Sequence, residues 1–111
     1  ARLLEAYEFS CAVSNSDAVA ALEAAHIVPY LGAHSNLTSN GLLLRADLHT
    51  LFDLNLFGVE PKTLRIILSE RLRTTSYAVF HEQQIRLPKV LSDSPSSDAL
   101  AWRWEMFLQA L

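Results

Sequence analysis

The chain has 111 residues, half of them apolar, and a formal net charge of −3. This length suits one globular domain, and no apolar run approaches the roughly 20 residues that a membrane-spanning helix needs. The single cysteine, Cys11, excludes an internal disulfide and is interpreted as a small buried residue in a reducing compartment. We therefore predict one cytoplasmic domain over residues 1–111, with no membrane partner, that is cut from a longer protein because it begins with alanine.

The first half of the chain alternates helical and extended patterns. Leu3, Leu4 and Tyr7 recur at helical spacing. The β-branched pair before Pro29 favours an extended chain, although the alanines that precede it favour a helix by propensity alone. The expected elements are a helix over 2–9, an extended segment over 22–30, a polar loop over 31–39, a strand over 41–44 and an amphipathic helix over 46–55.

The second half is predicted to add a hairpin and a closing helix. The expected elements are an antiparallel pair of strands over 57–59 and 63–68, a short helix and then a strand at 84–87 within the ambiguous stretch 72–87, a loop over 93–98 and a helix over 99–111. In the closing helix, Trp102, Met106 and Phe107 are expected to face inward. The fold class is therefore predicted to be α+β.

Basic residues gather in the later half of a chain that is acidic overall. They predict a phosphate-facing surface, although a solvated face of mixed charge fits the pattern equally well. The residues concerned are Lys62, Arg65, Arg71, Arg73, Arg86 and Lys89.

Four polar side chains stand out as candidates for chemistry. His26 closes the extended segment, and an imidazole accepts a proton from water near neutral pH. His49 and Asp53 are four residues apart on the predicted helix, so both can reach one divalent ion. Asn40 carries an amide that can orient an imidazole or a water. Taken singly, each has a structural explanation, such as a turn at Asn40 or a surface pair on the helix.

Together these residues lie in a sequence that resembles the HNH endonucleases of the ββα-metal fold. The resemblance runs over about residues 7–87 and is strongest in three segments: YEFSCAVS at 7–14, ALEAAHIVPY at 21–30 and NGLLLRADLHTLFD at 40–53. It implies two antiparallel strands and a helix around one divalent ion, with flanking helices and a small antiparallel hairpin. A run of this length is more specific than a single short motif.

The resemblance implies a metal-dependent endonuclease that hydrolyses double-stranded DNA. It would be the nuclease part of a restriction or anti-phage protein whose other domains select the target or gate activity. His26 is then the general base, Asn40 fixes the loop and the base, and His49 binds Mg²⁺ or Mn²⁺, which stabilises the transition state and the leaving 3′ oxygen. Products would carry 5′-phosphate and 3′-hydroxyl ends. A homodimer is left open. The arginines expected to contact DNA are Arg45, Arg65, Arg71, Arg73 and Arg86.

The chain departs from the family pattern in two places. Many members hold a structural zinc with two cysteine pairs, whose positions are here occupied by Cys11, Ser14, Arg45 and Leu48, so no structural zinc is expected. Many members also carry a ligand directly before the base, where this chain has an alanine, Ala25. The carboxylates that can replace it are Asp53 first and Asp47 second, with water or phosphate completing the shell, whereas His34 and Asn36 are interpreted as ordinary loop residues.

Two other classes of function are weighed against the nuclease. The first is a catalytically inactive module that keeps the fold and binds nucleic acid or a partner protein, which the alanine before the base favours. The second is a purely structural interaction domain, which leaves the polar residues without a purpose. The joint presence of His26, Asn40 and His49 favours the nuclease over both.

Overall fold

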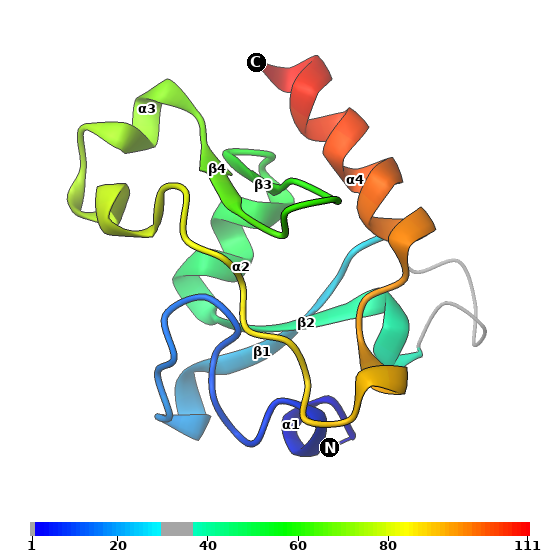
Figure 1. The fold of residues 1–111 in the computed structure, drawn as a ribbon. Coiled ribbons are helices and arrows are strands. Elements are labelled where there is room, and N and C mark those ends of the chain that lie inside the picture. The colour runs from blue at the N-terminus through cyan, green and yellow to red at the C-terminus, as the bar shows by residue number, and fades with distance from the viewer. Residues whose placement is uncertain (1, 30–36) are drawn as a thin grey trace.

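Short strands and helices alternate through residues 2–29 and 37–111, which are the residues that the computed structural model describes. The elements in chain order are α1 (Arg2–Ala6), β1 (Leu22–His26), β2 (Gly41–Arg45), α2 (Ala46–Asp53), β3 (Phe57–Val59), β4 (Ile66–Leu68), α3 (Glu70–Arg73) and α4 (Ser97–Ala110) (Figure 1). The predicted loop at 31–39, with His34 and Asn36, falls mostly outside the described residues.

The centre of the fold is a ββα unit made of β1, β2 and α2. The two strands pair antiparallel, with Leu22 opposite Arg45 and His26 opposite Gly41. β2 is buried along Gly41–Leu44, and α2 follows it without a loop, so the helix runs back across the hairpin with Leu48 and Phe52 buried beneath it. The predicted strands, the helix and the α+β class with a ββα core are confirmed.

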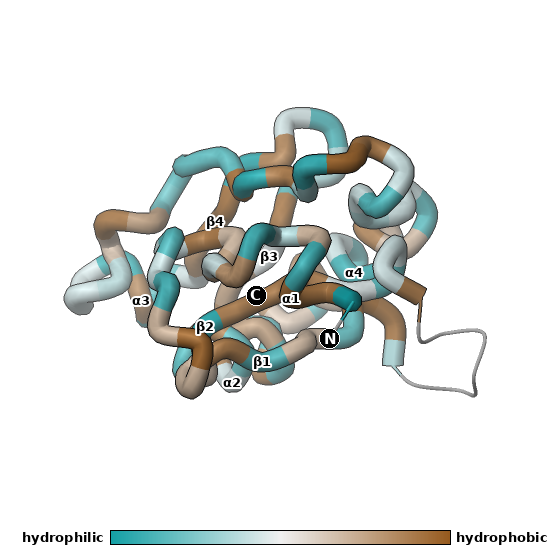
Figure 2. Tube along the Cα trace, turned by 90° about the horizontal axis from the view of Figure 1, so that it is seen from below, coloured by the Kyte–Doolittle hydropathy of each residue, from teal (hydrophilic) through white to brown (hydrophobic). Residues whose placement is uncertain are grey.

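The second hairpin and the last helix cover this unit. β3 and β4 pair antiparallel, as predicted. α4 packs on β3 so closely that a Cβ at Gly58 would lie 2.7 Å from the Phe107 ring, so only glycine fits there without a shift. Apolar segments, β2 among them, run through the interior in Figure 2. Within the described part of the chain, no helix is long and apolar enough to cross a membrane.

The structure differs from the sequence-based expectations at the end of α1 and at residues 84–87. α1 ends at Ala6, because Glu8 and Phe9 adopt left-handed backbone angles with φ of 55° and 59°. No strand forms at 84–87, where Gln84 makes only an isolated bridge to Arg65.

The inward face of α4 also differs. Trp102 was expected inside but is 40% exposed, while Arg103 beside it is 8% exposed. The buried residues of α4 are Ala99, Leu100, Arg103 and Phe107. The helix is thus rotated by one position from the phase that aromatic residues alone predict, since the arginine finds hydrogen-bond partners in the interior that the sequence does not reveal.

Candidate active site

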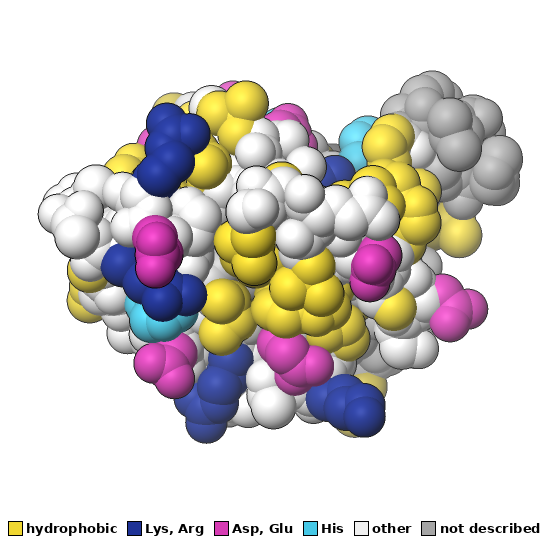
Figure 3. Space-filling model, turned by 90° about the horizontal axis from the view of Figure 1, so that it is seen from above, with side chains coloured by type: hydrophobic (Ala, Val, Ile, Leu, Met, Phe, Trp, Pro, Cys, Tyr) yellow, Lys and Arg dark blue, Asp and Glu magenta, His cyan; other side chains and the backbone are white. Residues whose placement is uncertain are grey.

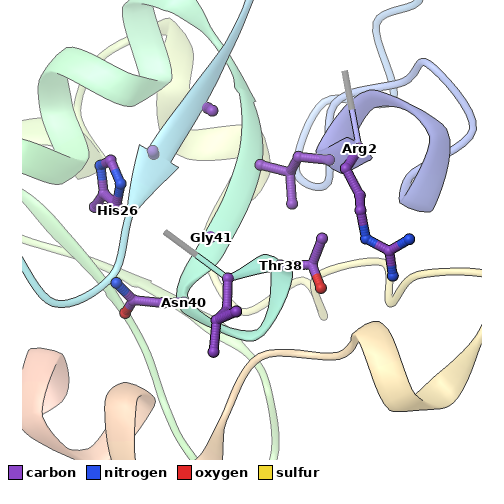
Figure 4. A pocket seen from close by; sticks show the side chains of 9 residues that line it. Arg2, His26, Thr38, Asn40 and Gly41 are labelled. Carbon is purple, nitrogen blue, oxygen red and sulfur yellow. The ribbon is translucent and has the colours of Figure 1, made fainter. Parts of the chain in front are cut away.

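His26 lies at the end of β1 and lines a hollow between β1, β2 and α1. The imidazole is half-buried, and the hollow has a volume of about 160 Å³. Arg2, Thr38 and Asn40 line the same hollow (Figure 4). A histidine at the wall of a small hollow of mixed polar and apolar lining is placed to meet a solvent molecule or a phosphate there.

Asn40 fixes the backbone that leaves His26. Its side-chain Oδ1 accepts a hydrogen bond of 2.9 Å from Val28 N, and its Nδ2 donates one of 3.0 Å to Val28 O. Its own carbonyl accepts from Ile27 N at 2.9 Å. Asn40 is only 9% exposed. The chain on the C-terminal side of His26 is therefore held by three hydrogen bonds to one residue.

His49 stands between two carboxylates. Its Nδ1 lies 2.7 Å from Glu23 Oε1 on β1, and its Nε2 lies 3.2 Å from Asp53 Oδ2 one helical turn later. A carboxylate only accepts hydrogen bonds, so both ring nitrogens face acceptors. The tautomer that donates Nδ1–H to Glu23 leaves the lone pair of Nε2 facing Asp53, an arrangement that a cation between the two atoms would stabilise. The sequence analysis did not single out Glu23. Its sequence signal is that it lies two residues before Ala25 on β1 and therefore shares the face of the strand on which Ala25 lies.

The pair of His49 Nε2 and Asp53 Oδ2 has the spacing of two ligands to one ion. Neighbouring ligands of an octahedral ion bound at 2.0–2.1 Å are about 3 Å apart. Asp53 is 56% exposed, which leaves room for water ligands. Among residues 2–29 and 37–111, no group of three or more histidine, cysteine, aspartate or glutamate side chains is placed to hold an ion. The donors present thus fit a magnesium-like ion with two protein ligands.

Arg103 joins the end of β1 to the end of α2. Its Nη1 donates to Ile27 O at 3.3 Å and its Nη2 to Phe52 O at 2.8 Å, while Nη2 also lies 3.8 Å from Asp53 Oδ1. Burial lowers the pKa of this guanidinium, and the carboxylate of Asp53 opposes that shift. Sequence reasoning missed Arg103. The available signal was its spacing of four residues from both Ala99 and Phe107 on an otherwise apolar face.

The far end of the ββα unit is built around Cys11. The Cys11 Sγ accepts hydrogen bonds from the backbone N–H groups of Ser14 and Arg45, both at 3.3 Å. Three of the four positions at which the sequence resemblance places zinc ligands therefore lie together. We call this region, formed by Cys11, Ser14 and Arg45, the Cys11 end, and the region of His26, Asn40 and Asp53 the His26 end.

Asp47, the second candidate ligand, belongs to the Cys11 end. Its carboxylate accepts from Arg45 at 2.7 Å and 3.0 Å and from the Tyr77 hydroxyl at 2.6 Å. The hydrogen bond from Arg45 is the main reason why the pKa of Asp47 falls to about 2. The hydrogen bond from the Tyr77 hydroxyl to Asp47 raises the pKa of Tyr77. Asp47 thus belongs to a structural cluster at the start of α2, whereas Asp53 lies at the end of the same helix.

The arginines that sequence analysis assigned to DNA are mostly engaged with the protein itself. Arg45 pairs with Asp47. The other contacts run to backbone carbonyls: Arg65 to Glu82 at 2.7 Å, Arg73 to Leu68 at 3.0 Å, and Arg86 to Tyr7 and Ser10 at 2.9 Å and 2.7 Å. Arg71 is exposed on α3. On the face seen in Figure 3, basic side chains are interspersed with acidic and neutral ones.

Arg2 is a cation that the sequence analysis did not select. It lines the hollow beside His26, and its Nη2 lies 3.1 Å from Asp93 Oδ1. Its side chain is 78% exposed. Nothing in the local sequence distinguishes Arg2 from other surface arginines, since its position depends on how α1 sits against β2.

Comparison with known proteins finds a family whose model matches the part of the chain that carries the site. Residues 11–60, which contain His26, Asn40, His49 and Asp53, match the model of a family described as HNH endonuclease. No curated protein matches the chain.

Among solved structures, the chain is similar to a protein titled "Modification dependent TagI restriction endonuclease", with a TM-score of 0.68 and 15% identity over 95% of this chain. The chain spans 35% of the length of that protein, and at this identity the likeness concerns the fold. The two comparisons agree: residues 11–60 are similar to the HNH endonuclease family, and the chain shares its fold with a restriction endonuclease.

Proposed function

We propose that the chain is a divalent-metal-dependent endonuclease domain that hydrolyses phosphodiester bonds in double-stranded DNA. The observation that carries this proposal is the donor pair of His49 and Asp53, 3.2 Å apart on α2, held to the strand end that bears His26 by a shared contact with Arg103. A general base and two ligands for an ion are the minimum set for metal-assisted hydrolysis.

His26 is proposed as the general base. A half-buried imidazole at the wall of the hollow accepts a proton from a water molecule that lies against the phosphate. Asn40 contributes indirectly, because its amide holds the peptide at Val28 and so limits the directions that the His26 ring can take. Together they supply the base and its orientation.

His49 and Asp53 are proposed as the protein ligands of Mg²⁺ or Mn²⁺. An ion bound there supplies Lewis-acid stabilisation of the charge that develops on the phosphate and on the leaving oxygen. Glu23 holds the His49 ring through Nδ1, which keeps Nε2 directed at Asp53. This is the carboxylate–histidine arrangement that orients metal-bound imidazoles in many proteins.

DNA contacts are proposed for exposed cations, of which one lies at the site. Arg2 lines the hollow itself, and Arg71 and Arg73 lie exposed on α3. Arg65 adds a further exposed cation. The similarity to a restriction endonuclease of which this chain spans 35% supports a role as the nuclease part of a larger protein, in which other domains choose the target. A restriction or anti-phage protein is the proposed setting.

A plasmid-cleavage assay tests the proposal. Purified wild-type chain should convert supercoiled plasmid to nicked or linear forms with Mg²⁺ or Mn²⁺ and should stop when a chelator is added, and the His26→Ala variant should be inactive. A wild-type chain that binds DNA but never cuts it, in either metal, would instead assign the fold to a catalytically inactive binding module.

A further inference from the structure

Arg103 is a buried charge that the fold retains although such groups are expensive. Its side chain is 10% exposed, and its Nε is buried without a hydrogen-bond partner. Burying a charge costs free energy unless it is fully paired. Among the described residues, the carboxylate that pairs with it is that of Asp53, at 3.8 Å. An apolar residue of similar size would fill the same space without that cost, so the guanidinium has a use that packing does not explain.

The neighbours of the guanidinium show what it connects. Ile27, whose carbonyl it binds, is the residue after His26, and Phe52, whose carbonyl it also binds, is the residue before Asp53. Phe52 O belongs to the last turn of α2, where a cation is favoured by the helix dipole. The guanidinium also stacks over the Phe52 ring, 4.5 Å from its centroid. One planar group thus bonds to both halves of the site.

We propose that Arg103 is a positioning residue that sets the separation between the general base on β1 and the metal ligands on α2. This inference rests on the proposed function, because it assigns Arg103 a role in arranging that site. The planar fork of arginine fixes the distance and angle between its two acceptors, whereas a lysine ammonium binds them as a single point. α4 lies outside the matched residues 11–60. The positioning residue of this chain therefore lies on its closing helix, beyond the segment that matches the family.

Two substitutions separate positioning from simple stabilisation. Arg103→Lys keeps the charge and loses the fork, and Arg103→Met keeps the length and loses the charge. Gln109→Met, on the exposed part of the same helix, is the matched control. Folding is checked by circular dichroism and thermal melting, Mn²⁺ affinity by calorimetry without DNA, and kcat and KM by plasmid cleavage at a temperature where every variant is folded.

The expected result is a folded Arg103→Lys variant with Mn²⁺ affinity lowered by about tenfold, as for other groups that orient ligands. Its kcat should fall by about a hundredfold, the loss typical of a misplacement of about 1 Å, with little change in KM. Gln109→Met should match wild type. A folded Arg103→Lys variant with wild-type affinity and kcat would overturn the inference. So would loss of the fold in both Arg103 variants, which would leave Arg103 a purely stabilising role. A wild-type chain without Mn²⁺ binding or cleavage would refute the proposed function itself.

Discussion

The Cys11 end and the His26 end of the ββα unit are held together by different kinds of contact. At the Cys11 end, a thiol sulfur accepts backbone N–H groups, and a partly exposed chain of Arg45, Asp47 and Tyr77 ties α2 to the segment after α3. At the His26 end, the amide of Asn40 and the buried guanidinium of Arg103 bind the backbone on both sides of the site.

The comparison distinguishes contacts that stabilise the fold from contacts that position the residues of the candidate site. The Cys11 end occupies the positions at which the sequence resemblance places zinc ligands, and four residue steps of β1 separate it from His26, about 13 Å along a strand. The site does not depend on that end for its ligands. Contacts at the His26 end bind backbone groups, while His26 stays half-buried at the wall of the hollow and Asp53 stays partly exposed, which suits a site that must admit a phosphate.

The sharpest way to break this comparison is to remove the base. We expect His26→Ala to lower kcat by about a hundredfold to ten-thousandfold, the usual contribution of a general base, while melting temperature and Mn²⁺ affinity stay near those of wild type. The measurement is plasmid cleavage beside calorimetry on the same preparation. Cleavage at the wild-type rate would remove His26 from the mechanism.

Glu23 tests how far the site extends toward the Cys11 end. Glu23→Gln can still accept a hydrogen bond from His49 Nδ1 through its amide oxygen, but it loses the charge that holds the ring. We expect Mn²⁺ affinity to fall by about tenfold to a hundredfold, as for other partners of metal-bound histidines. Calorimetric titration checks this, with Glu8→Gln as a control on an exposed carboxylate of the N-terminal turn. Unchanged affinity would show that the ion does not depend on this contact.

Cys11→Ala should give the opposite pattern. It removes a fully buried acceptor that serves the N–H groups of Ser14 and Arg45. We expect the free energy of unfolding to fall by about 1–3 kcal/mol, the cost of leaving buried donors unpaired, with kcat of the folded variant unchanged. Denaturant unfolding and plasmid cleavage measure the two quantities. A lowered kcat in the folded variant would show that the two ends are coupled.

The smallest expected effect is on acid stability at the Cys11 end. The pKa of Asp47 is lowered to about 2 by the hydrogen bond from Arg45, so its contribution is present above its ordinary pKa near 3.8 and is lost as pH falls from about 4 to about 2. The group is 37% exposed, so solvent screening limits the contribution to at most about 1 kcal/mol. Unfolding of wild type and Asp47→Asn at pH 6 and pH 3 should show a difference that shrinks with acid. A constant difference would contradict this assignment.

Local sequence patterns were enough to predict the strands and helix of the ββα unit and the second hairpin, because short apolar runs and helically spaced apolar residues mark the buried segments there. The strand predicted at residues 84–87 was wrong. These residues have a β-type composition, but they pair with a neighbouring segment at one bridge only, between Gln84 and Arg65. The family pattern pointed to His26, Asn40 and His49, and helical spacing pointed to Asp53; all four lie in or beside the ββα unit. Arg103, Glu23 and Arg2 were missed because each depends on contacts between segments far apart in the chain, up to 76 residues between Arg103 and Ile27.

The most direct test of the central claim is titration of Mn²⁺ into the wild-type chain and into His49→Ala and Asp53→Asn, with His26→Ala as the control that keeps both ligands. The account predicts that wild type and His26→Ala bind one ion with similar affinity and that both ligand variants lose binding while remaining folded. A folded Asp53→Asn variant that binds Mn²⁺ and cuts DNA like wild type would contradict the shared site on α2.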